Sequence, residues 1–195
     1  MAAKSTPTAW KGPNDNPSGA YWPSDLYQGV IGQVIVTPDP TSGYPQSQRA
    51  HRAVILDSTM STVPYAGAIA WWKDRGAGIV TTDPTGRRGH RAGVFTGAAP
   101  LTSPATFALS GPSTTVATAV FIQVGGRHAN VKFIDGVTAA PTAAGLIVIP
   151  SATAGKADCL AAGSAATYPI LGYTAGAYNA PNATAAVDLQ IEDTY

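Results

Sequence analysis

The sequence predicts an all-β protein, a small β-barrel or sandwich that follows an extended N-terminal arm. Glu192 is the only glutamate among 195 residues, and charged residues make up only 12% of the chain. Helical surfaces are normally built from Glu, Lys, Arg and Gln, which lose little rotamer freedom in a helix. This chain is rich instead in Thr, Val, Gly and Pro, which suit strands and the turns between them. Short apolar runs separated by turn residues recur along it, as in a barrel or sandwich.

Residues 1–28 are expected to form the extended arm, because prolines, glycines and asparagines punctuate them. Alone, such a segment buries too little apolar surface to offset the entropy lost on ordering. It either folds back on its own domain or lies on a neighbouring subunit, and the sequence does not separate these alternatives. In the second case Trp10, Tyr21 and Trp22 are the expected partner-binding anchors. Residues 29–195 are expected to form a single β domain, most regular over about 83–195.

The first half of that domain contains several candidate strands. The apolar runs predict strands at 30–36, 53–56, 69–72 and 78–82. A tight turn is expected at 83–86, where proline is second and glycine fourth. Trp71 and Trp72 are candidates for an interface anchor, although neighbouring strand residues point to opposite faces and at least one should be core.

The densest basic cluster is Arg87, Arg88 and Arg91, with His90 between them. Three interpretations remain open: a solvated loop, bidentate pairing with an acidic protein surface, and contact with nucleic-acid phosphates. We take the three arginines as candidate partner-binding residues. A short strand is expected at 92–95, followed by a long Pro/Ser/Thr-rich loop.

The last third is the most regular part. Strands are expected at 121–124 and 131–134, joined by a hairpin at 125–128. Apolar residues alternate with polar ones at 131–133 and 187–191, which predicts one buried face in each strand. The further strands expected are 146–149, whose continuous apolar run suggests burial on both faces, and 170–173. The best helical candidate is 157–166, although Gly163 and Ser164 interrupt it.

The chain carries few groups suited to catalysis. His51, His90 and His128 are expected to be solvated loop histidines, and no Gly-x-Ser-x-Gly elbow is present. The aspartates mostly occupy turn contexts, and Cys159 has no partner cysteine and is expected to be a small buried hydrophobe. No metal-ligand spacing or phosphate-binding loop is found. We therefore predict that the protein is not an enzyme, with no catalytic, cofactor-binding or metal-binding residues.

The charge and hydropathy of the chain indicate which classes of partner to expect: protein, but neither nucleic acid nor membrane. A net charge of +1 argues against a dedicated nucleic-acid binder. No apolar run approaches the roughly 20 residues that cross a bilayer, and residues 1–7 do not resemble a signal peptide. We expect synthesis in a cytoplasm and no membrane partner. A surface this poor in charge would be marginally soluble if it all faced water, so much of it is expected to face protein.

Residues 87–191 resemble the capsid decoration, or cement, proteins of tailed bacteriophages. The resemblance lies in a series of short strands and small residues: Arg91-Ala92-Gly93-Val94, Phe121-Ile122-Gln123-Val124-Gly125-Gly126, Gly145-Leu146-Ile147-Val148-Ile149-Pro150, Gly155-Lys156-Ala157-Asp158, Ile170-Leu171-Gly172-Tyr173-Thr174 and Val187-Asp188-Leu189. It implies a small barrel on the outer surface of a virion. It also implies a non-enzymatic protein that stabilises the capsid between major capsid protein subunits, as a homo-oligomer, a trimer rather than a dimer.

Three other readings remain. Another virion component, such as a head–tail connector, tail or head-fibre protein, has a similar composition. A carbohydrate-binding β module would present exposed aromatic residues on one face, for which Trp71, Trp72 and Tyr44 are the candidates. An enzyme would need a pocket that unites a histidine with an aspartate and a serine.

Overall fold

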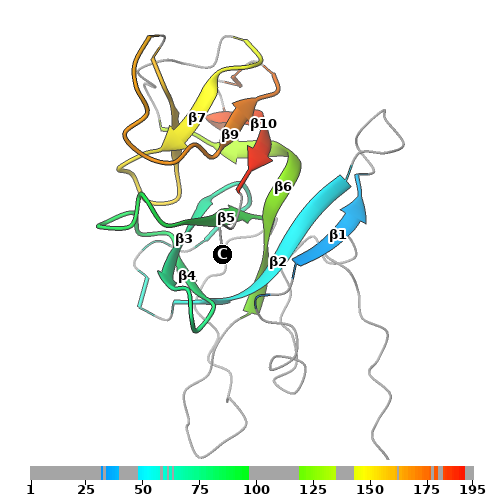
Figure 1. Cartoon of the computed structure of the whole chain (residues 1–195), viewed down its shortest axis with the longest axis vertical. Helices are drawn as coiled ribbons and strands as arrows, with labels where there is room; N and C mark the ends of the chain where they lie inside the picture. The colour runs from blue at the N-terminus through cyan, green and yellow to red at the C-terminus, as the bar shows by residue number, and fades with distance from the viewer. Residues whose placement is uncertain are drawn as a thin grey trace, which may run out of the picture.

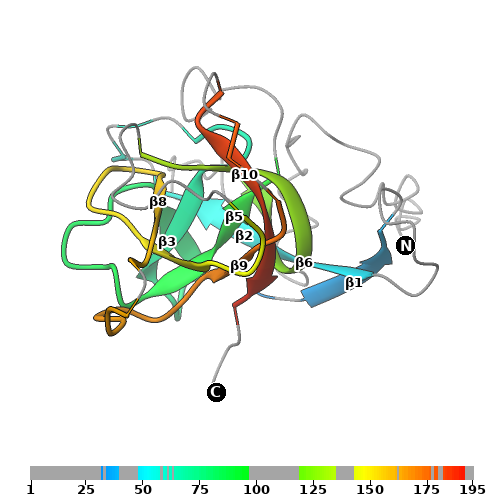
Figure 2. The same ribbon diagram turned by 90° about the horizontal axis from the view of Figure 1, so that it is seen from above.

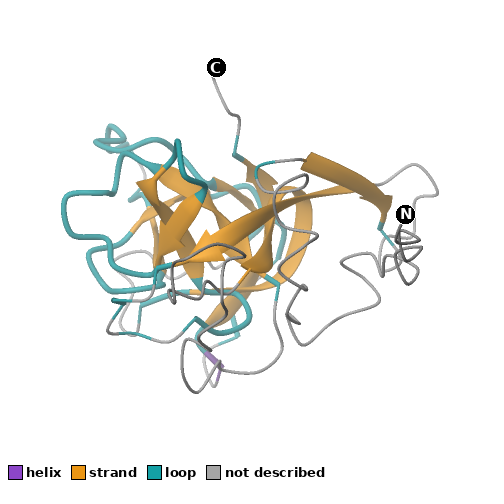
Figure 3. Ribbon diagram, turned by 90° about the horizontal axis from the view of Figure 1, so that it is seen from below, coloured by secondary structure: helices purple, strands orange, loops and turns teal. Residues whose placement is uncertain are grey.

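The computed structural model describes the following parts of the chain: residues 34–39, 48–57, 64–96, 119–134, 143–161, 163–176 and 182–191, with Gly32, Thr59, Met60, Thr62, Tyr178 and Asn179. These residues form strands and loops with almost no helix, as Figure 3 shows. The all-β prediction is confirmed. The predicted arm over 1–28, with Trp10, Tyr21 and Trp22, lies outside the described residues, as does Tyr44.

Within the described residues, ten strands make one sheet. They are β1 (Val34–Pro38), β2 (Gln48–Leu56), β3 (Ile69–Asp74), β4 (Ile79–Thr81), β5 (Arg91–Phe95), β6 (Ala119–Lys132), β7 (Ile147–Pro150), β8 (Ala157–Cys159), β9 (Gly172–Thr174) and β10 (Thr184–Gln190). Their order in the sheet is β1-β2-β4-β3-β5-β6-β10-β9-β7-β8. Each predicted strand of the first half overlaps an observed one, so the apolar runs located them correctly.

The pairings of five strands close on themselves. β2 pairs with β4 in parallel, β4 with β3, β3 with β5 and β5 with β6, all three antiparallel. β2 also pairs with β6, over residues 50–55 and 119–125, which completes the circuit. β10, β9, β7 and β8 continue from the other half of β6, and they form the upper part of the molecule in Figure 1.

β6 corrects the predicted hairpin at 125–128. The two runs on either side of Gly125 and Gly126 belong to one strand of 14 residues. Its first half pairs with β2 and its second half with β10, and the glycines lie where the partner changes. Gly126 has φ +77°, and a Cβ there would overlap the carbonyl oxygen of Gln48. The glycines therefore mark a close approach of two backbones rather than a turn.

We expect Gly126→Ala to lower the free energy of unfolding by roughly 2–4 kcal/mol, because alanine is strained at positive φ and its methyl group meets backbone. Gly125→Ala is the matched control, since its Cβ would lie 3.4 Å from the Ala50 Cβ, an ordinary contact. Urea denaturation of both variants checks this. Equal stability of the two variants would contradict the role assigned to Gly126.

The core fills the closed circuit and extends under β7–β10. Its largest fully buried side chains include Trp71, Phe133, Ile69, Ile122 and Leu171. The predicted alternation is confirmed in β10. Val187 and Leu189 are buried, Asp188 between them is less buried, and Gln190 is exposed. It is also confirmed at 131–133, where Val131 and Phe133 are buried on either side of the less buried Lys132.

Three local predictions are wrong. The described residues of 157–166 contain β8 and irregular chain instead of a helix, because Ala157–Cys159 pairs with β7. The run at 146–149 is not buried on both faces: Val148 is fully buried, while Ile147 and Ile149 are only partly buried. The turn predicted at 83–86 is shifted by one residue, since Arg87 N donates to the Pro84 carbonyl at 2.9 Å.

Candidate interaction surfaces

The β1 edge, defined here as Val34, Val36 and Pro38, is an apolar stripe on an outer strand. β1 lies at one end of the strand order and, among the described residues, pairs only with β2. Val34 is 44% exposed and Val36 is 54% exposed, and alternate residues of a strand share a face. No residue of β1 carries a charge. Natural edge strands usually carry charges that block pairing with another chain, and among the described residues this edge has no such charge.

The strand that carries this edge stands to one side of the sheet, as Figure 2 shows. Its far end is held by an ion pair between Arg49 and the buried Asp39, at 2.7 Å. The proline at the end of β1 has no backbone N–H and is therefore tolerated in an edge strand. The sequence placed 34–36 in a strand, but nothing in its continuous apolar run indicated that the two valines would be exposed.

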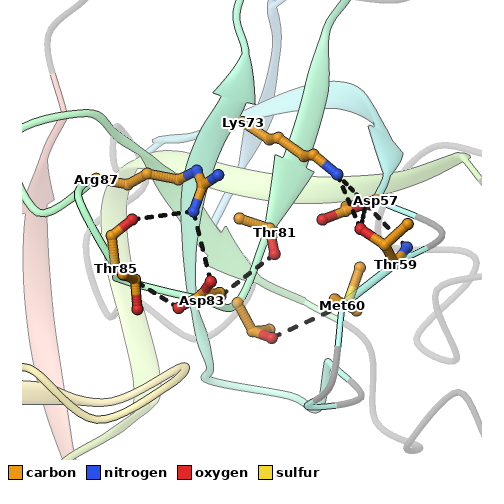
Figure 4. Close-up of polar contacts among 9 residues, drawn as sticks. Asp57, Thr59, Met60, Lys73, Thr81, Asp83, Thr85 and Arg87 are labelled. Carbon is orange, nitrogen blue, oxygen red and sulfur yellow. Dashed lines mark hydrogen bonds and ion pairs between the residues drawn. The ribbon is translucent and has the colours of Figure 1, made fainter.

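The three candidate arginines all make contacts within the chain. Arg87 Nη1 lies 3.0 Å from the Thr85 carbonyl oxygen and 3.4 Å from Asp83 Oδ2, as Figure 4 shows. The Arg88 guanidinium lies 4.5 Å from the centre of the Tyr168 ring. Arg91 Nη1 donates to the carbonyl oxygen of Ile170. The cluster therefore ties the turn before β5 to the loop before β9.

Asp83 organises that turn. It accepts a hydrogen bond from Thr85 N at 3.0 Å. Hydrogen bonds from Thr85, followed by the charge of Arg87, lower the pKa of Asp83 below its ordinary value. The partner-binding role predicted for Arg87, Arg88 and Arg91 stays a prediction, with the addition that Arg87 is already engaged by an acid of its own turn.

A second polar cluster fixes the loop after β2. Asp57 is buried and accepts hydrogen bonds from Lys73 Nζ at 2.6 Å and from the Thr59 hydroxyl at 2.8 Å (Figure 4). Burial raises the pKa of Asp57, but the hydrogen bonds from Lys73 and Thr59 outweigh it and leave the pKa below its ordinary value. These contacts hold the loop after β2 in place, because the Asp57 carboxylate is hydrogen-bonded to other groups of the chain.

The histidines correct a prediction. His90 is exposed in a turn, as expected, but His51 is 2% exposed within β2, and His128 is partly buried within β6. Burial, followed by the charge of Arg49, lowers the pKa of His51 to about 4. Burial, Arg49 and then His51 lower the pKa of His128 to about 4 as well, against an opposing hydrogen bond to the Phe95 backbone. Both side chains are therefore neutral at pH 7.

Cys159 is buried, as predicted, and burial raises the pKa of its thiol to about 12.

Within the described ranges, no group of three or more His, Cys, Asp and Glu side chains is placed to hold a metal ion. The part of the chain that the structure describes also contains no helix long and apolar enough to cross a membrane.

Trp71 and Trp72 are both buried, at 0% and 6% exposure. Neither can serve as the exposed aromatic platform of a carbohydrate-binding module or as an interface anchor. The two side chains leave opposite faces of β3, and the second face is covered because the Arg52 guanidinium lies 5.8 Å from the centre of the Trp72 ring.

A cavity of about 310 Å³ lies beside the arginine cluster and is lined by residues of that turn, of β7 and β8, and of the loop before β9. The sequence did not predict it, because Arg88 is more than 60 positions away from its other polar residues, which are ordinary in their local context. Comparisons of the chain with models of protein families, with curated proteins and with solved structures found no match.

Proposed function

We propose that this is a structural virion protein that decorates a bacteriophage capsid and stabilises it by binding between major capsid protein subunits. The observation that carries the proposal is the β1 edge. A strand with two exposed valines and no charge stands at the border of a large sheet. Such an edge can accept a strand from another protein, with main-chain hydrogen bonds giving affinity and alternate side chains giving specificity.

The positions of the residues that resemble decoration proteins support the proposed capsid role. The segments that resemble decoration proteins fall on β5, β6, β7, β8, β9 and β10. These six strands are consecutive in the order of the sheet. We interpret the closed circuit of β2, β4, β3, β5 and β6 as the small barrel of the proposal, with β10, β9, β7 and β8 as its extension.

The proposed role depends on binding alone. A protein that binds only the assembled lattice stabilises that lattice by mass action. One that touches several capsid subunits gains avidity, because the second contact forms at high effective concentration. In this proposal the chain acts on the outer capsid surface as a homo-oligomer, a trimer rather than a dimer. Residues 1–28 supply an arm, and Arg87, Arg88 and Arg91 supply polar contacts.

The test is occupancy on capsids that lack this protein. Val36→Lys places a charge on the β1 edge and is expected to lower the affinity for capsids at least tenfold, because a lysine on an edge strand opposes pairing. Ala144→Lys is the matched control, since it adds the same charge at an exposed turn away from β1. Sedimentation of capsids with each purified variant measures the bound fraction. Equal binding of both variants would overturn the role of the β1 edge.

A further inference from the structure

The cavity beside the arginine cluster has two kinds of wall. Ile149, Pro150 and Leu160 form an apolar side. Arg88, Asp158 and Tyr168 bring a guanidinium, a carboxylate and a phenol to the same space. Its volume of about 310 Å³ is at the lower end of the range of small-molecule sites, roughly 300–1,000 Å³.

The charged groups of this cavity keep hydrogen-bonding capacity. Two other described aspartates of loops contact a cation: Asp57 contacts Lys73, and Asp83 contacts Arg87. Asp158 instead accepts one hydrogen bond, at 2.8 Å, from the backbone N–H of the next residue, Cys159. Arg88 stacks on Tyr168 and, among the described residues, forms no ion pair. The contact with the ring holds the guanidinium in place, and its N–H groups form no hydrogen bond within the described part of the chain.

The phenol adds to this arrangement. One face of the Tyr168 ring is covered by Arg88, and the side chain as a whole is partly buried. The cavity therefore presents fixed donors, a fixed acceptor and an apolar wall before any ligand arrives. A site that is already ordered loses little entropy when it binds.

We propose that this cavity binds one residue of a neutral saccharide. Neighbouring hydroxyls of a sugar ring both donate and accept, so they match a carboxylate and a guanidinium placed together. The C–H face of the ring fits the apolar wall of Ile149, Pro150 and Leu160. Because charges of opposite sign line the same small space, an ionic ligand of either sign meets a like charge. The inference does not depend on the capsid role.

The expected affinity of one such site for a saccharide is low, and it rises when several sites bind together. A single small pocket with few polar contacts gives modest affinity. Several copies of the chain held together would bind a saccharide-coated surface far more tightly than one copy does, because each further contact forms at high effective concentration.

The test is a glycan array probed with the full-length chain, which compares neutral with acidic saccharides, followed by titration of the strongest hit by NMR. We expect neutral glycans to bind. Asp158→Asn should weaken binding at least tenfold, since it replaces one of the two carboxylate oxygens, which accept hydrogen bonds, with an amide NH₂ group, which donates them. Tyr168→Leu should do the same by releasing Arg88. Asp188→Asn is the control, because this exposed aspartate lies on β10 and pairs with Arg127.

Each outcome decides the proposal. Neutral glycan binding that is lost in Asp158→Asn or Tyr168→Leu and kept in Asp188→Asn supports it, provided that the variants show wild-type thermal unfolding. If Asp158→Asn fails to fold, Tyr168→Leu carries the comparison. No binding of neutral glycans, binding of acidic glycans alone, or equal binding by all variants overturns it.

Discussion

Acidification from pH 7 to pH 4 is expected to destabilise the chain by about 3 kcal/mol through His51 alone. Its pKa is about 4 in the folded chain, against 6.5 for an unperturbed histidine. Each unit of difference corresponds to about 1.4 kcal/mol. Between these two pH values the unfolded chain takes up a proton that the folded chain excludes. Stability is therefore complete above pH 6.5 and falls as the pH drops toward 4.

His128 contributes in the same direction, because its pKa is also lowered to about 4. The two effects are not additive, since each histidine lies in the field of Arg49 and the charge of His51 also acts on His128. The cause is structural: β2 carries His51 between β1 and β6, where the ring is almost completely shielded from water.

Urea denaturation at pH 7 and pH 4 measures the effect. His51→Leu should flatten the pH dependence by about half, because leucine fills the same space without a titratable group. It also removes a buried Nδ1 that has no hydrogen-bond partner among the described residues. His90→Gln is the control, as His90 is exposed in a turn. A pH dependence unchanged in His51→Leu would show that the buried histidine does not cause the acid lability.

Trp71→Ala is expected to cost about 3–5 kcal/mol, the usual range for removing a large aromatic side chain from a core. Trp71 is the largest fully buried side chain described, and its strand pairs with both β4 and β5 inside the closed circuit. Deleting the indole leaves a cavity that five paired strands cannot readily collapse to fill.

Trp71→Phe should cost less, since it keeps an apolar ring and removes an indole N–H that has no hydrogen-bond partner among the described residues. Val36→Lys, on the exposed β1 edge, should leave the unfolding free energy nearly unchanged. Thermal and chemical unfolding of the three variants check the order. A loss below about 1 kcal/mol for Trp71→Ala would contradict the placement of this residue in the core.

The strands were predictable where local sequence decides the structure. The apolar run at 69–72 gave β3, and the alternation at 187–191 gave the buried face of β10, because side-chain periodicity follows from strand geometry. The hairpin at 125–128 was wrong because two glycines have the same local signature in a turn and at a backbone crossing. Only the distant strand β2, which passes Gly126, distinguishes the two.

The candidate sites depend even more on distant contacts. The sequence identified Arg87, Arg88 and Arg91 as a cluster, but it could not show that Arg88 stacks on Tyr168 or that Arg91 reaches Ile170, 79 residues away. It predicted solvated histidines, whereas strand pairing buries His51. It did not predict the exposed valines of β1 or the cavity at Asp158, because both depend on which neighbouring strand is present or missing.

The most direct test of the proposed function is an image of the native phage particle on which that proposal places this chain. We expect a density map to show the ten-stranded sheet on the outer capsid surface, at a junction between major capsid protein subunits, with the β1 edge against a neighbouring protein. A particle whose outer surface lacks this fold, while the purified chain remains a folded protein that does not bind capsids, would contradict the account.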